Sequence, residues 1–466
     1  MIEAAPQPAS GGNTRYTAGA MRVVFRGIDD LLQLMPELTD AERADVDFGS
    51  YSAEQFFDDM ARVTAYRADP DLVELLVHNS FPTLVWMRHQ GVRFQPSYGR
   101  QAFKVDGRFT FWGGLAVEAW GGGEGLVEHE HKACERAGVR LVYDTAAHSL
   151  MTNDDGAVVG ITVRRGGRRH RIECEAVILA TGGFESNAEW RARYLGPNWD
   201  LAKVRGTKFN TGAGIRMALD VGAMPYGHWS GAHAVAWDLN APAFGDLAVG
   251  DGFQKHSYPL GIMVNADGER FVDEGADFRN YTYAKYGAVI LDQPDMLAWQ
   301  IFDQKVTHLL RDEYRIRQVT RVTADTLAEL VAKLDGVHPQ RCLQTIEEFN
   351  AAVQSDIPFN PAVKDGRGTP GIPHPKTNWA NPLDTPPYEA YAVTCGITFT
   401  FGGLKITMNG AVVDTTERPI PGLYACGELV GGLFYSNYPG GTGLTAGAVF
   451  GKIAGTSAAH SLARFG

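Results

Sequence analysis

Cysteine is scarce in this sequence and its few positions follow no pattern. Five cysteines are spread over 466 residues, none forms a C-x-x-C pair, and the even, dense spacing of a small disulfide-linked protein is absent. We therefore expect a reducing compartment, no disulfide framework and no metal site. His129 and His131, in GLVEHEHK, do not alter this, because residues two apart on a helix point to different faces.

Long apolar runs and excess positive charge are also missing. No stretch approaches the 18 or more consecutive apolar residues of a membrane span, and MIEAAPQPASGG resembles no signal peptide. The formal net charge of −11 argues against a general nucleic-acid binder. The sequence thus predicts a soluble, cytoplasmic protein of two or three domains that binds no nucleic acid. Five arginines between positions 164 and 171 are interpreted as the solvated face of a hairpin.

Glycine is what the sequence has in excess. It supplies 54 of the 466 residues, above the usual share of about 7%, which indicates many places of close backbone approach. Local patterns alternate between helix and strand. Helices are expected from Ser52, from Pro70, over 126–137, 323–334 and 339–353, and from 440 through 454. Strands are expected over 139–143, around the turn Gly166-Gly167, over 176–180, 404–407, 411–414 and 423–426. This order is typical of an α/β fold.

Two glycine motifs lie where such folds bind ligands. The apolar run 176–180 ends in Thr181-Gly182-Gly183, as a buried parallel strand that delivers a turn at its carboxyl end. The run Gly441-x-Gly443-x-x-Ala446 has the letters of a dinucleotide fingerprint, but too little chain follows it to complete that fold. We interpret it as a helix start whose free N–H groups face an electron-rich ligand, or as a turn before a core helix.

A series of further motifs occurs in an order that identifies a family. They are Glu3, GGNT at 11–14, ATGG at 180–183, TGAGIRMALDVG at 211–222, GIMVNADGERFVDE at 261–274, Gly402-Gly403 and ACGE at 425–428. Through them the sequence resembles the flavoproteins of the fumarate reductase and succinate dehydrogenase family. GGNTRYTAGAMR, FWGGLAVEAWGGG, DEGADFRNYTYAKYG and YSNYPGGTGLTAGAVFG are most similar to the branch that dehydrogenates tricarballylate, a tricarboxylate.

The resemblance implies a fold and a cofactor. The fold would be an FAD-binding Rossmann-like domain of the glutathione-reductase type over 1–228 and 396–466, with an inserted α+β capping domain over 229–395. FAD would be bound noncovalently, because covalent members carry a histidine in the early loop where this chain has Asn13-Thr14. The positions that match cofactor-binding residues are Glu3, Gly12, Asn13, Thr14, Gly19, Ala180, Thr181, Gly182, Glu428, Gly443 and Leu444.

The same comparison suggests catalytic residues. Arg279 matches the arginine that transfers a proton in fumarate reductases; because arginine rarely loses its proton, it is alternatively an electrostatic clamp, with Tyr281 or His256 as base. Tyr438 matches a tyrosine that polarises a ketone in 3-ketosteroid dehydrogenases. Candidate substrate-binding residues are His233, Thr398, Gly441 and Thr442, with Lys255 a further basic residue of the inserted unit.

Two departures from the family pattern bear on the substrate. The chain reads TFTFGG at 398–403 and SNYPGG at 436–441, where fumarate reductases place a histidine and an arginine that hold carboxylates. Fumarate and succinate are therefore disfavoured. We expect an FAD-dependent dehydrogenase that converts a small carboxylate, tricarballylate, to cis-aconitate. The alternative substrates are a 3-ketosteroid or an enoyl acid.

Partners and completeness raise further expectations. Nothing in the chain ligates an iron–sulfur cluster, so the resemblance implies a separate membrane-bound iron–sulfur protein as electron acceptor. The sequence starts two residues before Glu3, without the apolar strand and G-x-G-x-x-G that precede such an acid in relatives. We expect a misplaced start or a shortened chain, the alternative being a truncated, non-catalytic relative. Trp112, Trp120 and the glycines at 121–123 are expected either near the flavin or in packing.

Overall fold

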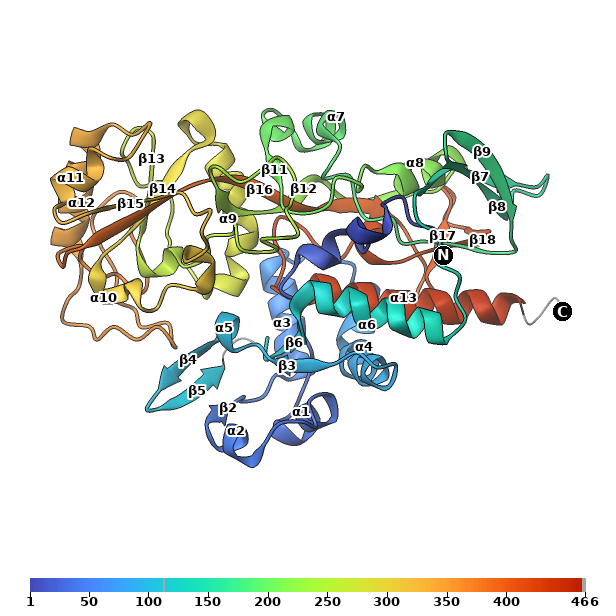
Figure 1. The fold of residues 1–466 in the computed structure, drawn as a ribbon, viewed down its shortest axis with the longest axis horizontal. Coiled ribbons are helices and arrows are strands. Elements are labelled where there is room, and N and C mark those ends of the chain that lie inside the picture. Colours follow the sequence, from blue (N-terminus) through green and yellow to red (C-terminus); the bar gives the residue numbers. More distant parts are fainter. Residues whose placement is uncertain (112–113, 463–466) are drawn as a thin grey trace.

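A computed structural model of the chain describes residues 1–111 and 114–462, so Trp112 lies outside the described residues. Helices and mixed sheets alternate along the chain (Figure 1), which confirms the predicted α/β class. One long strand, β16 (Tyr388–Leu404), contributes to the two largest apolar cores: its first residues belong to one core and its last residues to the other. The last part of β16 also lines the cavity described below.

A small sheet in the order β10-β18-β17 ends at the first predicted glycine turn. β10 (Val177–Leu179) pairs in parallel with β18 (Pro419–Ala425), which pairs antiparallel with β17 (Ala411–Val413). The strand predicted over 176–180 is therefore confirmed. The carboxyl ends of β10 and β18 lead directly to Thr181 and Glu428, so the parallel pairing places both at one edge of the sheet.

The predicted hairpin is present beside this sheet. β7 (Thr145–Thr152), β8 (Val158–Arg165) and β9 (Arg168–Glu173) form an antiparallel meander in which every residue of β9 is exposed. Gly166 and Gly167, with φ of 55° and 77°, supply the left-handed turn between β8 and β9. The strand expected over 139–143 is wrong: only the bridge Ile2–Val142 forms there.

The largest sheet lies at the other end of Figure 1 and contains the part of the chain expected as a cap. β16 pairs with every other strand of this sheet except β13, which pairs with β14 instead. β16 continues past residue 395 and its partner β12 extends across residue 228, so both strands cross the expected domain boundaries. The division into domains stays a prediction. The other strands are β11 (Lys203–Val204), β12 (Pro225–Asp238), β13 (Ile262–Asn265), β14 (Ala298–Phe302) and β15 (Arg321–Ala324).

One helix expected in this region is wrong in part. Residues Arg321–Ala324 pair with β16, because β-branched Val322 and Thr323 suit a strand. The helix α11 begins only at Leu327, after Thr326 accepts a hydrogen bond from the Glu329 N–H and caps it. The helix α12 (Pro339–Ala352) forms as predicted. Other helices here are α7 (Ala188–Trp190), α8 (Ala213–Asp220), α9 (Tyr283–Leu291), α10 (Gln304–Thr307) and α11 (Leu327–Val331).

The remaining elements pack below the two sheets in Figure 1. The helices predicted from Ser52 and Pro70 are confirmed: Ser52 forms a capping box with Gln55, and Asp69 caps the helix that Pro70 opens. The strands are β1 (Ala20–Met21), β2 (Val46–Asp47), β3 (Phe94–Pro96), β4 (Ala102–Val105), β5 (Arg108–Phe111) and β6 (Val117–Ala119). The helices are α1 (Ile28–Leu34), α2 (Asp40–Ala44), α3 (Ala53–Val63), α4 (Pro70–His89), α5 (Tyr98–Gln101), α6 (Gly122–Arg136) and α13 (Thr442–Leu462).

Within the described ranges, no helix has both the length and the apolar character that a bilayer crossing requires. The longest, α13, packs against α4 and the small parallel sheet.

Candidate active site

A cavity of about 980 Å³ runs between the small sheet, α13 and β16. This volume is at the upper end of the range of about 300–1,000 Å³ usual for ligand pockets. Most of the residues predicted as site residues line it: Glu3, Gly12, Asn13, Thr14, Ala180, Thr181, Gly182, His233, His256, Arg279, Thr398, Glu428, Tyr438, Gly441, Gly443 and Leu444.

At one end of the cavity, Asn13 ties the early loop to distant segments. Its Nδ2 donates to Glu185 Oε1 (2.7 Å) and to the Thr398 carbonyl (2.6 Å), and its Oδ1 accepts from the Thr207 N–H (2.9 Å). On the neighbouring turn, Glu428 Oε1 accepts from the Thr400 N–H (2.8 Å). These contacts fix the early loop and the β18 turn on the same side of the cavity.

The walls of this end leave space that no protein atom fills. A Cβ added at Gly12, Gly427 or Gly447 would meet nothing within 4 Å, and all three glycines line the cavity. The buried Thr181 Oγ1, also in the wall, has no hydrogen-bond partner among the described residues. The open space at these glycines therefore suits a large ligand. The α13 N-terminus presents Gly443 and Leu444 to the cavity nearer its aromatic end, since a Cβ at Gly443 would lie 3.8 Å from Phe399 and from Tyr438. Its free N–H groups favour electron-rich groups there.

Aromatic side chains enclose the other end. The hydroxyls of Tyr283 and Tyr438 lie 2.5 Å apart, and the His233 ring packs at 5.0 Å and 4.8 Å from their rings. Phe399 closes the group on the β16 side. Burial, helped by Arg205, lowers the pKa of His233 far below its ordinary value, and burial raises the pKa of both tyrosines. His233 is therefore a neutral ring, and neither of its nitrogens has a partner among the described residues.

Two arginines bring positive charge to this end. Arg205 bonds Asp251 Oδ1 through Nε (2.7 Å) and Thr398 Oγ1 through its guanidinium (3.2 Å). Arg279 lies 3.3 Å from His256 Nδ1, in the cavity wall and 7% exposed. Both guanidiniums act electrostatically on the Tyr283 hydroxyl. The aromatic end is thus a chamber with two buried guanidiniums in its wall, of which that of Arg205 is paired with Asp251.

Three predicted site residues do not line the cavity. Tyr281 donates to Asp59 Oδ2 (2.6 Å), and burial raises its pKa to about 12. Gly19 packs on Gly122, where a Cβ would lie 2.7 Å from a backbone carbon. Thr442, the first residue of α13, is fully buried. Their functional roles stay predictions.

The more weakly assigned residues are placed as follows. Lys255 is buried on main-chain carbonyls, among them that of Glu313 (3.1 Å), away from the cavity wall. Trp120 is 50% exposed beneath Arg93, whereas Gly123 packs so tightly on the early loop that a Cβ would lie 1.9 Å from the Thr14 carbonyl. His131 lines the cavity, but no group of metal-binding side chains occurs among the residues that the structure describes.

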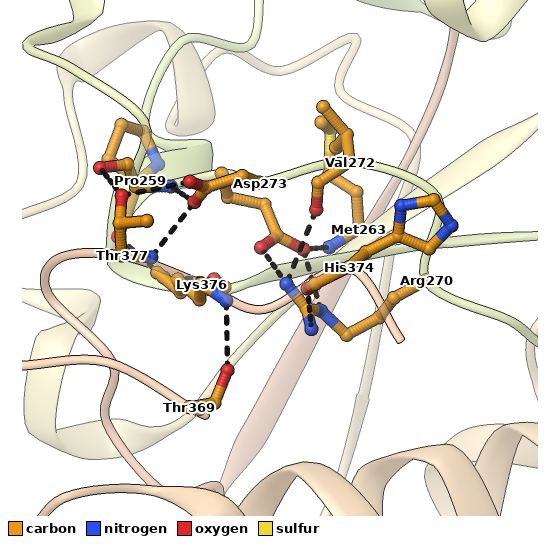
Figure 2. A network of polar contacts seen from close by, with 12 residues as sticks. Pro259, Met263, Arg270, Val272, Asp273, Thr369, His374, Lys376 and Thr377 are labelled. Carbon is orange, nitrogen blue, oxygen red and sulfur yellow. Dashed lines mark hydrogen bonds and ion pairs between the residues drawn. The ribbon is translucent and has the colours of Figure 1, made fainter. Parts of the chain in front are cut away.

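A polar network secures the segment that leads to Arg279 (Figure 2). Arg270 pairs with Glu274, whose Oε1 accepts from the Met263 N–H at 2.8 Å. The fully buried Lys376 donates to the Pro259 and Gly261 carbonyls at 2.7 Å and 2.6 Å. The predicted GIMVNADGERFVDE motif thus forms a rigid support immediately before Arg279.

Comparisons with known proteins agree with this geometry. The family model described as FAD binding domain matches residues 40–444. The chain belongs to this family. It is therefore an FAD-dependent oxidoreductase related to the fumarate reductase and succinate dehydrogenase flavoproteins.

Individual relatives differ in the substrates named for them. A probable fumarate reductase of Shewanella frigidimarina is 28% identical over 98% of this chain and 70% of its own length. A 3-oxosteroid 1-dehydrogenase of Mycobacterium tuberculosis is 27% identical over 79% of this chain and 68% of its own. Among solved structures, the open conformation of a flavocytochrome c3 fumarate reductase is similar with a TM-score of 0.71 and 26% identity, over 98% of this chain and 73% of that one. The relatives thus share the flavoprotein fold.

The residues present fit FAD. The open space beside Gly12, Gly427 and Gly447 provides a cradle that the protein leaves unfilled. Glu428, Asn13 and the α13 N-terminus would hold the cofactor from three elements. The early loop contains no histidine, in keeping with a noncovalent cofactor.

Sequence reasoning missed Arg205, Asp251, Tyr283 and Glu185. Arg205 comes just before the quoted 211–222 motif, and Tyr283 is within NYTYAKYG, two residues after the predicted Tyr281. Their proximity to known motifs was the available signal. The contacts that bring them to the site, with Asn13, with each other and with Tyr438, join residues more than 20 positions apart, so spacing along the sequence could not reveal them.

Proposed function

We propose that the protein dehydrogenates a CH–CH bond of a tricarboxylate, converting tricarballylate to cis-aconitate. When bound, FAD supplies the hydride acceptor for such a reaction. The observation that carries the proposal is the enclosed chamber with Arg205 and Arg279 in its wall. An anionic substrate gains most where guanidiniums are shielded from water.

The side chains that line the chamber have different proposed roles. Arg205, held by Asp251 and Thr398, presents a fixed guanidinium to a substrate carboxylate. The neutral His233 offers one ring N–H donor and one acceptor. Arg279 either takes the proton from the substrate carbon or neutralises a second carboxylate. In the latter case His256, 3.3 Å away, is the nearest base.

Anaerobic bleaching of the flavin absorbance tests the substrate. We expect tricarballylate to bleach the FAD-loaded protein, succinate to react at least about 100-fold more slowly, and a 3-ketosteroid to have no effect. No bleaching by tricarballylate would refute the proposal, and a protein that binds FAD but bleaches with no substrate would favour a non-catalytic relative.

Variants test the role of Arg205. Arg205→Gln should raise the KM for tricarballylate about 10-fold to 100-fold, since a charge-assisted hydrogen bond contributes about 1.5–3 kcal/mol. Because this change leaves Asp251 buried without its partner, R205Q/D251N serves as the charge-balanced variant. The exposed Arg62, which pairs with Asp277 and does not line the cavity, provides the control R62Q. An unchanged KM in both Arg205 variants would remove Arg205 from the substrate site.

The Tyr283–Tyr438 pair favours a second candidate, a 3-ketosteroid. A tyrosine hydroxyl that receives a hydrogen bond from a second tyrosine is a suitable donor to a ketone oxygen, and Phe399 and Phe434 supply apolar walls. The same bleaching assay distinguishes the two: bleaching by a 3-ketosteroid and none by tricarballylate would establish this alternative.

We also propose a cytoplasmic location and reoxidation of the flavin by a separate, membrane-bound iron–sulfur protein. The absence of a candidate cluster site among the described residues supports an external electron acceptor. Following flavin reoxidation with and without a membrane fraction tests this proposal.

A further inference from the structure

Two carboxyl groups meet at the cofactor end of the cavity. Glu185 follows the Gly182-Gly183 turn and is fully buried, whereas Glu428 lines the cavity. Their side chains lie within hydrogen-bonding reach of each other. A hydrogen bond between carboxyl groups requires a proton on one of them, since ionised carboxylates only accept.

The donors around the pair are distributed unevenly. Glu185 Oε1 accepts from Asn13 Nδ2 (2.7 Å) and Asn210 Nδ2 (2.6 Å), whereas Oε2 receives no donor from the described part of the chain. Glu428 accepts from the main-chain N–H groups of Thr400 and Gly183. Each carboxyl is thus fixed by neutral donors, and the contact between the two contains no donor unless a proton is added.

The guanidinium of Arg191 lies beside Glu185. It donates to main-chain carbonyls, including that of Glu185 and that of Trp199 at 2.7 Å, and forms no ion pair with either carboxylate. Two negatively charged carboxylates within hydrogen-bonding reach of each other in a buried site would repel strongly. Burial and the neighbouring carboxyl accordingly raise the pKa of Glu185.

We propose that Glu185 and Glu428 share one proton at neutral pH, and that Glu185 thereby acts as a positioning residue for the FAD site. The shared proton holds the Glu428 carboxyl in place while leaving its remaining lone pairs toward the cavity. Through Asn13 and Asn210, Glu185 also fixes the two loops beside it. The backbone is fitted closely to this group: a Cβ at Gly183 would lie 2.1 Å from Glu428 Oε1, and one at Gly206 2.1 Å from Asn13 Oδ1.

The proposal predicts a pH dependence whose sign is fixed. A raised folded-state pKa means that the folded protein retains a proton that the unfolded chain releases above about pH 4.3. Stability should therefore fall as the pH rises from that value to the raised pKa. Within this window the unfolding equilibrium constant should increase about ten-fold per pH unit for one extra bound proton.

Glu185→Gln is the decisive variant, because an amide donates permanently to the Glu428 carboxylate and has no proton to lose. In the FAD-loaded protein, E185Q should remove this part of the pH dependence of unfolding. The infrared spectrum of the wild type at neutral pH should contain a protonated carboxylic acid band that E185Q lacks. Glu185→Ala should weaken FAD binding about ten-fold, since the Asn13 and Asn210 amides each lose the acceptor that Glu185 provides.

Two matched changes serve as controls. Glu130 is another glutamate in the cavity wall, so E130Q measures any contribution from that group. E189Q changes an exposed glutamate four residues from Glu185. A wild-type spectrum without the acid band, or a pH profile that E185Q leaves unchanged, would overturn the shared proton. The wild-type spectrum decides even if the variant fails to fold, and neither measurement depends on which substrate the enzyme oxidises.

Discussion

At the scale of single residues, the molecule buries charge for two different purposes. Arg205 and Arg279 are only 8% and 7% exposed and line a cavity, where an ion pair with Asp251 holds the Arg205 guanidinium in the wall. Lys376 is also buried, but its ammonium group donates to main-chain carbonyls. It belongs to the polar network that supports the segment before Arg279 (Figure 2). Its charge is structural.

Lys376→Met should therefore reduce stability in a pH-dependent way. Burial lowers the pKa of Lys376 to about 8, so between this value and about 10.4 the unfolded chain holds more protons and the Lys376 contribution to stability rises with pH. At about pH 7 we expect K376M to cost about 2 kcal/mol, because two carbonyls lose their donor, and to cost more at about pH 9.5. Urea unfolding at both pH values measures this, with the exposed Lys333→Met as control. An equal loss at both pH values would contradict the lowered pKa.

At the scale of elements, α13 combines two kinds of glycine position. Gly447 and Gly455 lie in the same helix, and a Cβ on either would meet nothing within 4 Å, but only Gly447 lines the cavity. The open space beside Gly447 is therefore part of the cavity, whereas the open space beside Gly455 lies outside it.

Gly447→Leu should bind FAD at least about ten-fold more weakly than the wild type, because the new side chain occupies the cavity. The apoprotein should be as stable as the wild type or more so, since leucine favours a helix over glycine by about 0.8–1 kcal/mol. Titration of the apoprotein with FAD and thermal unfolding measure the two effects. Gly455→Leu is the matched control, and equal FAD binding by both variants would place the cofactor elsewhere.

The elements that were predictable from sequence are those with local signals. The capping box at Ser52, the proline at residue 70 and the paired glycines at 166–167 each specify a boundary within a few residues. The helix expected over 323–334 begins later, at Leu327, because tertiary pairing with β16 determined the strand at Arg321–Ala324. At the site, motif residues such as Asn13 and Glu428 were found, but Glu185 and Arg205 matter through partners brought together only by folding.

At the scale of the whole molecule, β12 and β16 join the regions that were expected to be separate domains. Their pairing extends from Pro225–Leu404 to Asp238–Val393. We therefore expect the proposed cap and the FAD-binding region to unfold together. The rise in FAD fluorescence on release of the cofactor and proteolytic cleavage within 229–395 should show the same urea midpoint. With FAD at about 100 times its Kd, the free energy of unfolding measured by either probe should rise by about 2.7 kcal/mol. Two separate midpoints would show independent units.

Consecutive residues of β16 serve different ends of the cavity. Thr398 contacts Arg205, Phe399 packs against His233, and Thr400 donates to Glu428. Because neighbouring side chains in a strand point to opposite faces, insertion of one residue here would exchange all these partners at once. Substrate preference in this architecture can therefore diverge by replacement of side chains along the strand, whereas changes in its length would disrupt cofactor and substrate binding together.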